Sequence, residues 1–124
     1  MASILVIDDE KLQRAILRKI LEGAGHTVLD AQDGKRALEV YAESPTEVVI
    51  SDMYMPEMDG LEFLVRVRET FPRARIIALS GGGYMGKEEV LAAASRLGAV
   101  GVLEKPYTVE ECLEKVEEVL KEDL

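Results

Sequence analysis

The sequence lacks the features that mark disulfide-rich and membrane-spanning proteins. Its 124 residues include no tryptophan, four prolines and one cysteine, Cys112. A lone cysteine cannot form an intrachain disulfide, so we expect a buried thiol in a reducing compartment. The longest apolar run, residues 90–94, has five residues, whereas a membrane-spanning helix needs about 20. Because a signal-peptide pattern is also missing, we expect a cytoplasmic protein that makes no membrane contact.

Basic residues are also in the minority. Fifteen Lys and Arg stand against 24 Asp and Glu, which gives a formal net charge of −9. This is the wrong sign for holding a polyanion, so direct binding of nucleic acid is not expected. A chain of this length with 48% hydrophobic residues suits one globular domain, which we expect to occupy residues 1–124.

Short runs rich in valine and isoleucine alternate with longer stretches of helical periodicity. This alternation is typical of βαβ units around a parallel sheet. We predict an α/β fold with a flavodoxin-like, doubly wound sheet of five parallel strands in the order 2-1-3-4-5, and five helices. The predicted strands are 3–8, 26–31, 47–52, 75–80 and 100–104.

The apolar faces and the capping residues of the predicted helices support this division of the chain into alternating strands and helices. The first helix has an apolar stripe of Leu12, Ile16, Leu17, Ile20 and Leu21, and the last has one of Val109, Cys112, Leu113, Val116, Val119 and Leu120. We expect both stripes to face the sheet. Capping boxes are predicted at Asp59 with Glu62 and at Thr108 with Glu111, while Asp33 is expected to cap the second helix.

Polar side chains with reactive groups follow four of the five predicted strands. The first strand runs into Asp8 and Asp9, the third ends at Asp52, the fourth ends at Ser80, and the fifth is followed by Lys105. In the predicted strand order these four strands are neighbours, and ligands of open α/β sheets bind at the carboxyl ends of the strands. The sequence therefore predicts that these side chains converge.

Three carboxylates in one crevice repel one another unless a cation lies among them. Mg²⁺ prefers carboxylate oxygens, water and phosphate, so Asp8, Asp9 and Asp52 suit this ion. A carboxylate can act as a nucleophile towards phosphorus when cationic groups offset the charge of the transferring oxygens. Lys105 would supply such a charge, and Ser80 could donate a hydrogen bond to the phosphoryl group.

The sequence resembles the receiver domains of two-component response regulators (CheY-like) over essentially its whole length. The shared motifs are VIDDE at 6–10, DMYMPEMDG at 52–60, Ser80 and Lys105-Pro106. The resemblance implies that Asp52 is the phosphoacceptor, that Asp8, Asp9 and Asp52 bind Mg²⁺ with the backbone carbonyl of Tyr54, and that Ser80 and Lys105 contact the phosphoryl group. It also implies a cis peptide bond before Pro106.

The resemblance further implies a signalling switch rather than an enzyme, with limited self-catalysed phosphorylation and dephosphorylation. The expected donor is a phosphohistidine on a sensor histidine kinase or a histidine phosphotransfer protein. The first helix, with Lys11, Arg14, Arg18 and Lys19, would form the donor's docking surface, unless these residues are only a solvated basic face. Output would pass to a protein target, to an output domain, or through a phosphorylation-dependent homodimer.

The sequence departs from the family's pattern at the position of the switch aromatic residue. Three positions before Lys105, where the family usually has an aromatic residue, stands Val102. Tyr84, in the glycine-rich segment 81–86, is a candidate substitute, unless it is only a tyrosine on the surface of a loop. We expect this segment to move with Ser80, and we expect Tyr54 to shield an aspartyl phosphate from water.

Two kinds of enzyme compete with this interpretation. Residues 81–87 match the P-loop pattern G-x-x-x-x-G-K, but Glu88 stands where a P-loop has serine or threonine. A phosphatase with an aspartate nucleophile, of the haloacid-dehalogenase class, would need a second aspartate two residues after the first. Glu10 and Tyr54 occupy those positions. A flavin-binding module fails similarly, because no hydroxyl-rich loop follows the first strand.

Overall fold

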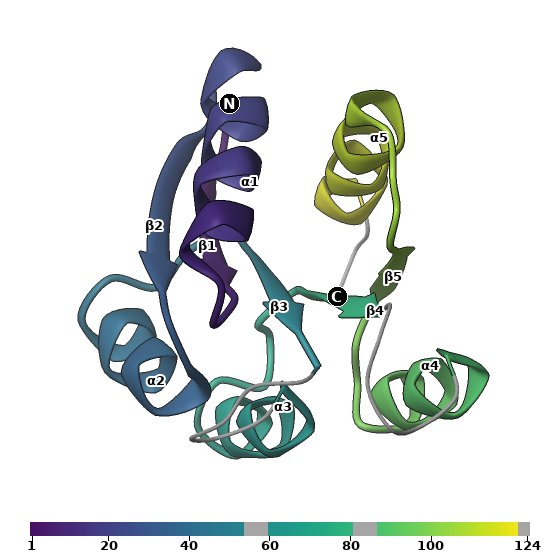
Figure 1. The fold of residues 1–124 in the computed structure, drawn as a ribbon. Helices are drawn as coiled ribbons and strands as arrows, with labels where there is room; N and C mark the ends of the chain where they lie inside the picture. Colours follow the sequence, from purple (N-terminus) through teal and green to yellow (C-terminus); the bar gives the residue numbers. More distant parts are fainter. Residues whose placement is uncertain (54–59, 81–86, 122–124) are drawn as a thin grey trace.

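Five strands and five helices alternate along the chain (Figure 1). The structure is a computed structural model that describes residues 1–53, 60–80 and 87–121. The elements are β1 (Ser3–Ile7), α1 (Lys11–Gly23), β2 (Thr27–Ala31), α2 (Gly34–Glu43), β3 (Val48–Asp52), α3 (Gly60–Thr70), β4 (Ile76–Ser80), α4 (Lys87–Arg96), β5 (Gly101–Glu104) and α5 (Val109–Leu120).

The strands form one parallel sheet in the order β2-β1-β3-β4-β5, which confirms the predicted topology. The strand bounds differ slightly from the prediction, since β1 ends one residue earlier and the other strands begin one residue later. These end residues still bond across the sheet. The Asp8 N–H donates to the Ala31 carbonyl at 3.2 Å, and the Arg75 carbonyl accepts from the Val49 N–H at 2.8 Å.

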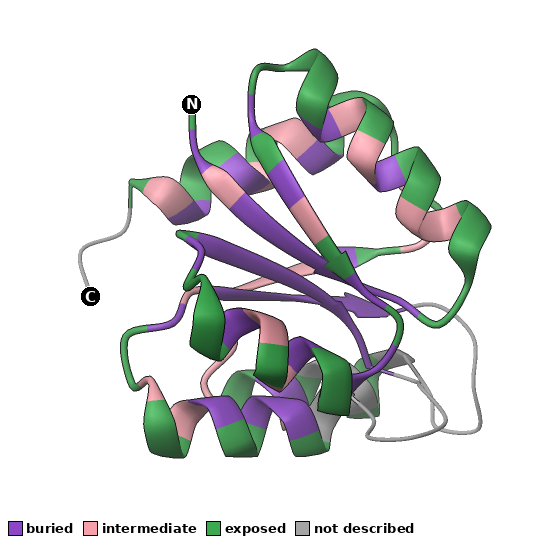
Figure 2. Ribbon diagram, turned by 90° about the vertical axis from the view of Figure 1, so that its left-hand side faces the viewer, coloured by how far each residue is buried: buried purple, intermediate pink, exposed green. Residues whose placement is uncertain are grey.

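Helices cover both faces of the sheet, and the strands between them are mostly buried (Figure 2). α1 and α5 lie on one face, where Leu17, Leu21, Cys112, Val116 and Val119 pack against β-strand side chains such as Ile4, Ile50 and Ile77. On the other face, α2, α3 and α4 contribute Ala37, Tyr41, Phe63, Leu64 and Ala94. Burial on both faces explains why the strands are continuous apolar runs rather than alternating ones.

Part of the predicted helix stripes does not face the sheet. Leu12 is 68% exposed, Ile16 41% and Val109 53%. The prediction was wrong for these three side chains, because helical periodicity shows which residues share a face but not how much of that face a neighbouring element covers. Ile16 and Val109 instead line an open groove between α1 and α5.

Side-chain caps begin two of the helices as predicted. The Asp33 carboxylate accepts from the Arg36 N–H at 2.7 Å at the start of α2. At the start of α5, Thr108 and Glu111 form a complete capping box. The third predicted cap, Asp59, lies outside the described residues. None of the helices within residues 1–53, 60–80 and 87–121 has the length and apolar content that a membrane-spanning segment needs.

Candidate functional site

Four elements deliver polar side chains to the carboxyl edge of the sheet. Asp8 follows β1, Asp52 ends β3, Ser80 ends β4, and Lys105 follows β5. The neighbouring strands are in register, with Ile7 opposite Ser51 and Asp52 opposite Leu79. Asp8, Asp52 and Ser80 are buried, although their groups are polar, so each needs a partner or a ligand to offset its lost hydration.

Lys105 joins the two buried carboxylates. Its Nζ lies 3.4 Å from Asp52 Oδ2 and 3.5 Å from Asp8 Oδ2. One ammonium group therefore balances two carboxylates that would otherwise repel each other in a partly dehydrated site. The predicted convergence of Asp8, Asp52 and Lys105 is confirmed by these distances.

Of the two carboxylate oxygens of Asp8, one accepts a hydrogen bond and the other does not. Its Oδ1 accepts from the Glu10 N–H at 2.9 Å. Its Oδ2 is buried and has no hydrogen-bond partner in the described part of the chain. A buried carboxylate oxygen with only a lysine at ion-pair distance suits a metal ion or an ordered water as its missing partner.

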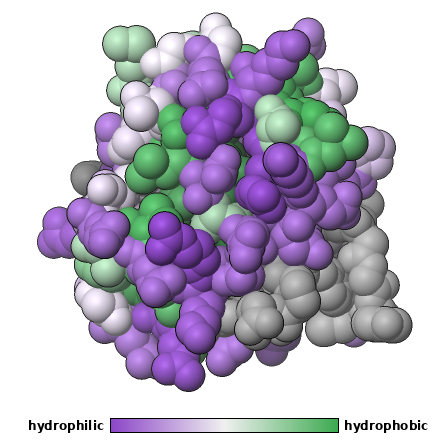
Figure 3. All heavy atoms as spheres, turned by 60° about the vertical axis from the view of Figure 1, so that its left-hand side comes forward, coloured by the Kyte–Doolittle hydropathy of each residue, from purple (hydrophilic) through white to green (hydrophobic). Residues whose placement is uncertain are grey.

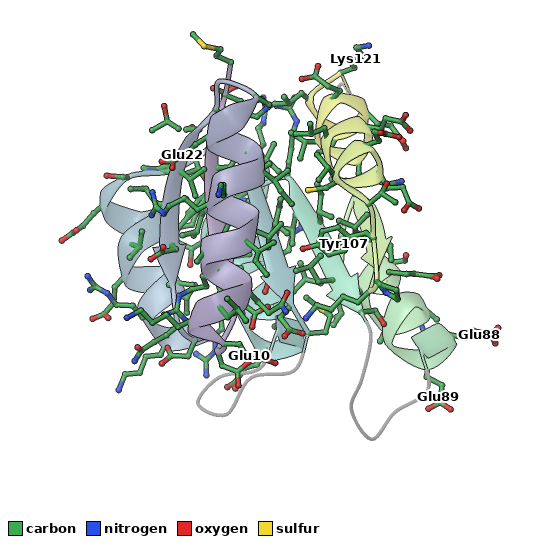
Figure 4. The ribbon with its side chains drawn as sticks, turned by 45° about the horizontal axis from the view of Figure 1, so that its top comes forward. Glu10, Glu22, Glu88, Glu89, Tyr107 and Lys121 are labelled. Atoms are coloured by element: carbon green, nitrogen blue, oxygen red, sulfur yellow. The ribbon has the colours of Figure 1, made fainter. Side chains whose placement is uncertain are left out.

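Asp8 also belongs to a cluster of three acidic side chains. Carboxylate oxygens of Asp8, Asp9 and Glu10 lie within 4.8 Å of one another. Glu10 is the member that sequence reasoning did not select, although it stands in the same motif. Figure 4 shows it at the start of α1, beside the sheet edge. The donor set, hard oxygens that are partly open to solvent, fits Mg²⁺ with water completing its shell.

Ser80 lies at the same edge with its side chain inside the protein. Its Oγ is buried and lacks a hydrogen-bond partner among the described residues. Its backbone carbonyl accepts from the Lys105 N–H at 2.7 Å, which ties the ends of β4 and β5 together. The peptide bond between Lys105 and Pro106 is cis, as expected. A hydroxyl group without a partner at this edge can donate to an arriving ligand.

Comparison with known families agrees with this arrangement. Residues 4–117 match the model of the response regulator receiver domain. The chain belongs to this family. Its members are signalling domains of two-component systems rather than classical enzymes.

Individual relatives match over nearly the whole receiver domain. The chemotaxis protein CheY of Listeria monocytogenes is 31% identical over 122 residues, which cover 98% of this chain and 100% of that protein. The response regulator MprA of Mycolicibacterium vanbaalenii is 34% identical over 118 residues, which cover 95% of this chain but 50% of that protein. A solved structure of Vibrio cholerae chemotaxis protein CheY4 superposes with a TM-score of 0.87 at 32% identity, covering 96% of this chain and 98% of that chain.

Several residues selected from the sequence are not described by the structure. Tyr54 and Tyr84 lie outside the described residues, as does most of the P-loop-like segment 81–87. Val102 is described: it is partly buried on β5 and lines a groove with Pro106 and side chains of α5. The aromatic position of the receiver family is thus occupied by a smaller aliphatic side chain.

Tyr107 and Cys112 pack on the α1 and α5 side of the sheet, where both side chains remain neutral at ordinary pH. Tyr107 lies between α1 and α5 (Figure 4). Burial, with smaller contributions from Cys112 and Asp8, raises the pKa of Tyr107 to about 12. Burial also raises the pKa of the Cys112 thiol to about 11. Cys112 is unpaired and buried, as expected, so its role is packing rather than reactivity.

Proposed function

We propose that this receiver domain accepts a phosphoryl group on Asp52 from a phosphohistidine of a sensor histidine kinase or a histidine phosphotransfer protein, and that it acts in the cytoplasm. The observation that carries the proposal is Lys105, whose Nζ lies 3.4 Å from Asp52 Oδ2 and 3.5 Å from Asp8 Oδ2. This contact supports the proposal because it brings the Asp52 carboxylate, which would be the nucleophile, close to a positive charge and to a second carboxylate.

In the proposed transfer, an oxygen of the Asp52 carboxylate forms a bond to phosphorus. The phosphorus–nitrogen bond of the donor breaks, its electron pair goes to the imidazole nitrogen, and that nitrogen takes a proton from solvent. Lys105 would then leave the Asp52 carboxylate and pair with a phosphoryl oxygen, because the charge has moved outward onto the phosphoryl group. Hydrolysis of the acyl phosphate by water would reverse the modification, so the domain would show limited self-catalysed turnover.

The proposed metal is Mg²⁺, held by Asp8, Asp9 and Asp52 with the backbone carbonyl of Tyr54. The buried Asp8 Oδ2 without a hydrogen-bond partner supports this assignment, as does the closeness of Asp8, Asp9 and Glu10. When bound, the ion supplies positive charge that offsets the phosphoryl oxygens. Asp9 and Glu10 are both exposed at the rim, and we assign Glu10 to orienting coordinated water.

Ser80 is the proposed sensor of the phosphorylated state. Its buried Oγ would donate a hydrogen bond to a phosphoryl oxygen, a contact that only the modified protein offers. A ligand shifts an equilibrium only through contacts that differ between the two states. Movement of Ser80 would pass to segment 81–86 directly along the chain, and to β5 through the bond between the Ser80 carbonyl and the Lys105 N–H.

The proposed docking site for the donor is the groove between α1 and α5. Ile16, Ile20 and Val109 line it, and it reaches Lys105 and Pro106 at the sheet edge. A helix carrying the phosphohistidine can lay its apolar side along this groove while its imidazole reaches Asp52. Of the basic residues of α1, Lys19 lines the groove. Arg18 turns towards β2 instead and pairs with Asp30 at 3.0 Å.

Incubation with Mg²⁺ and acetyl phosphate tests the proposal, with intact mass as the readout. We expect the mass to rise by one phosphoryl group, and the label to be stable in acid and labile in base. Asp52→Asn should remain unmodified. Asp30→Asn is the matched control, because it replaces an exposed aspartate of β2 and should be modified like the parent. Unchanged parent mass, or modified Asp52→Asn, would refute the assignment, and ATP hydrolysis would revive the P-loop interpretation.

The output is proposed to be a protein–protein interaction. The match to all of a CheY protein supports a receiver that acts by binding a target, and the match to half of MprA supports one that controls an output domain. A phosphorylation-dependent homodimer is a third form of output. A pull-down with and without acetyl phosphate, followed by light scattering, separates these three forms.

A further inference from the structure

Arg14, on the first turn of α1, donates a hydrogen bond to the backbone of Asp8, the first residue of the acidic pair Asp8 and Asp9. Its Nη1 donates a hydrogen bond of 2.7 Å to the carbonyl oxygen of Asp8. The side chain is half-buried and faces β2, where it lines a polar pocket with Asp30, Lys35 and Arg36. Figure 3, which brings the β2 and α2 side forward, shows hydrophilic residues over much of the visible surface, with hydrophobic patches between them. Arg14 thus points away from the apolar groove that we assign to the donor.

Three hydrogen bonds hold Asp8 from different directions. Its N–H donates to the Ala31 carbonyl of β2 at 3.2 Å. Its carbonyl accepts from Arg14, and its Oδ1 accepts from the Glu10 N–H at 2.9 Å. The remaining oxygen, Oδ2, is the buried atom without a hydrogen-bond partner among the described residues. Every other polar atom of Asp8 is bonded, so these three contacts, together with the Lys105 ammonium 3.5 Å away, orient Oδ2.

The bond from Arg14 also affects Asp9. The Asp8 carbonyl belongs to the planar peptide unit that joins Asp8 to Asp9, so a bond that fixes this carbonyl fixes the rotation of the unit. The residues on either side of the unit carry the two carboxylates. Because a hydrogen bond from a charged donor is among the stronger kinds, Arg14 can hold this orientation before any ion arrives.

We propose that Arg14 is a positioning residue for the Mg²⁺ site: it fixes the Asp8–Asp9 peptide so that both carboxylates are presented to the ion. This inference rests on the proposed function. Removing a group that orients metal ligands typically weakens metal binding about 10- to 100-fold. Arg14 acts on the backbone rather than on a ligating atom, so we expect a loss of about tenfold, at the lower end of that range.

The sign of the effect separates positioning from simple electrostatics. Arg14 is a cation near a proposed cation site. If only its charge mattered, removing it would strengthen Mg²⁺ binding, because like charges repel. Weaker binding in Arg14→Ala therefore cannot come from the lost charge and points to lost orientation of Asp8 and Asp9.

Arg18 provides a matched control on the same helix. It lies one turn after Arg14, is half-buried, and donates through Nη1 to the Val28 carbonyl of β2 at 3.0 Å. It also pairs with Glu22 at 3.1 Å and with Asp30 at 3.0 Å. Arg18→Ala removes the same kind of bond between α1 and the β2 side of the sheet, but away from Asp8 and Asp9.

The test is calorimetric titration of the unphosphorylated, full-length chain with Mg²⁺, together with amide hydrogen exchange of Glu10 in metal-free buffer. We expect Arg14→Ala to raise the Kd about tenfold and to speed exchange at Glu10, and Arg18→Ala to stay within about twofold of the parent. Arg14→Gln, a milder change, should shift both readouts in the same direction and serves if Arg14→Ala fails to fold.

Three outcomes would overturn the inference: an unchanged Kd in a folded Arg14 variant, tighter binding in that variant, or equal weakening in the Arg14 and Arg18 variants. These three outcomes can be distinguished from a failure of the proposed function. If the parent itself binds no Mg²⁺ or is not phosphorylated, the proposed function fails. If the parent binds Mg²⁺ and the Arg14 variants bind it equally well, only the role of Arg14 fails.

Discussion

Replacing Lys105 by Met should destabilise the metal-free protein through the two carboxylates that Lys105 joins. The side chains of Asp8 and Asp52 are 0% and 11% exposed, and that of Lys105 is 21% exposed. Breaking a fully buried ion pair by removing one partner costs about 3–5 kcal/mol. Exposed pairs are worth about 0–1 kcal/mol. Because Lys105 is partly in contact with water, we expect Lys105→Met to cost about 2 kcal/mol.

A double-mutant cycle with Asp8→Asn isolates the electrostatic part of this cost. The Asp8→Asn variant keeps only one of the two carboxylates that Lys105 joins, so Lys105→Met should cost less than about 1 kcal/mol in that background, giving a coupling of about 1 kcal/mol or more. The free energies come from urea unfolding followed by circular dichroism, in buffer with a chelator. A coupling below about 0.5 kcal/mol, the level of independent sites, would show that Lys105 does not balance these carboxylates.

Three further predictions concern the α5 side of the protein. Thr108→Ala removes the capping box of α5 and should lower the free energy of unfolding by about 1 kcal/mol in urea titrations. The buried Cys112, with its pKa raised to about 11, should not react with a thiol reagent at pH 8 until urea unfolds the protein. Since burial raises the pKa of Tyr107 to about 12, its contribution to stability is complete below the unfolded value near 10 and is lost as pH rises from there to 12. The parent should therefore lose more stability than Tyr107→Phe across that range.

The topology of the sheet and the convergence of its polar ends could be predicted from the sequence. Continuous apolar runs followed by Asp8, Asp52, Ser80 and Lys105 identify both the strands and their carboxyl ends. Parallel order then brings those ends together, since every strand runs in the same direction. These inferences depend only on the local pattern and on one topological rule.

Contacts between elements were harder to predict. Leu12, Ile16 and Val109 share faces with core residues, but the arrangement of α1 and α5 leaves them exposed. The bond from Arg14 to the Asp8 carbonyl was also missed, because the basic residues of α1 look alike in the sequence. Only the packing of α1 against the sheet shows which arginine of this helix reaches the Asp8 carbonyl.

Asp52 is the residue proposed to carry the phosphoryl group, and one measurement tests this directly. Borohydride reduction converts an aspartyl phosphate into homoserine, which peptide mass mapping can locate. After treatment of the parent with Mg²⁺ and acetyl phosphate, we predict homoserine at position 52 and at no other aspartate. Homoserine at Asp8 or Asp9, or its absence at position 52 in protein whose intact mass had risen, would contradict the assignment.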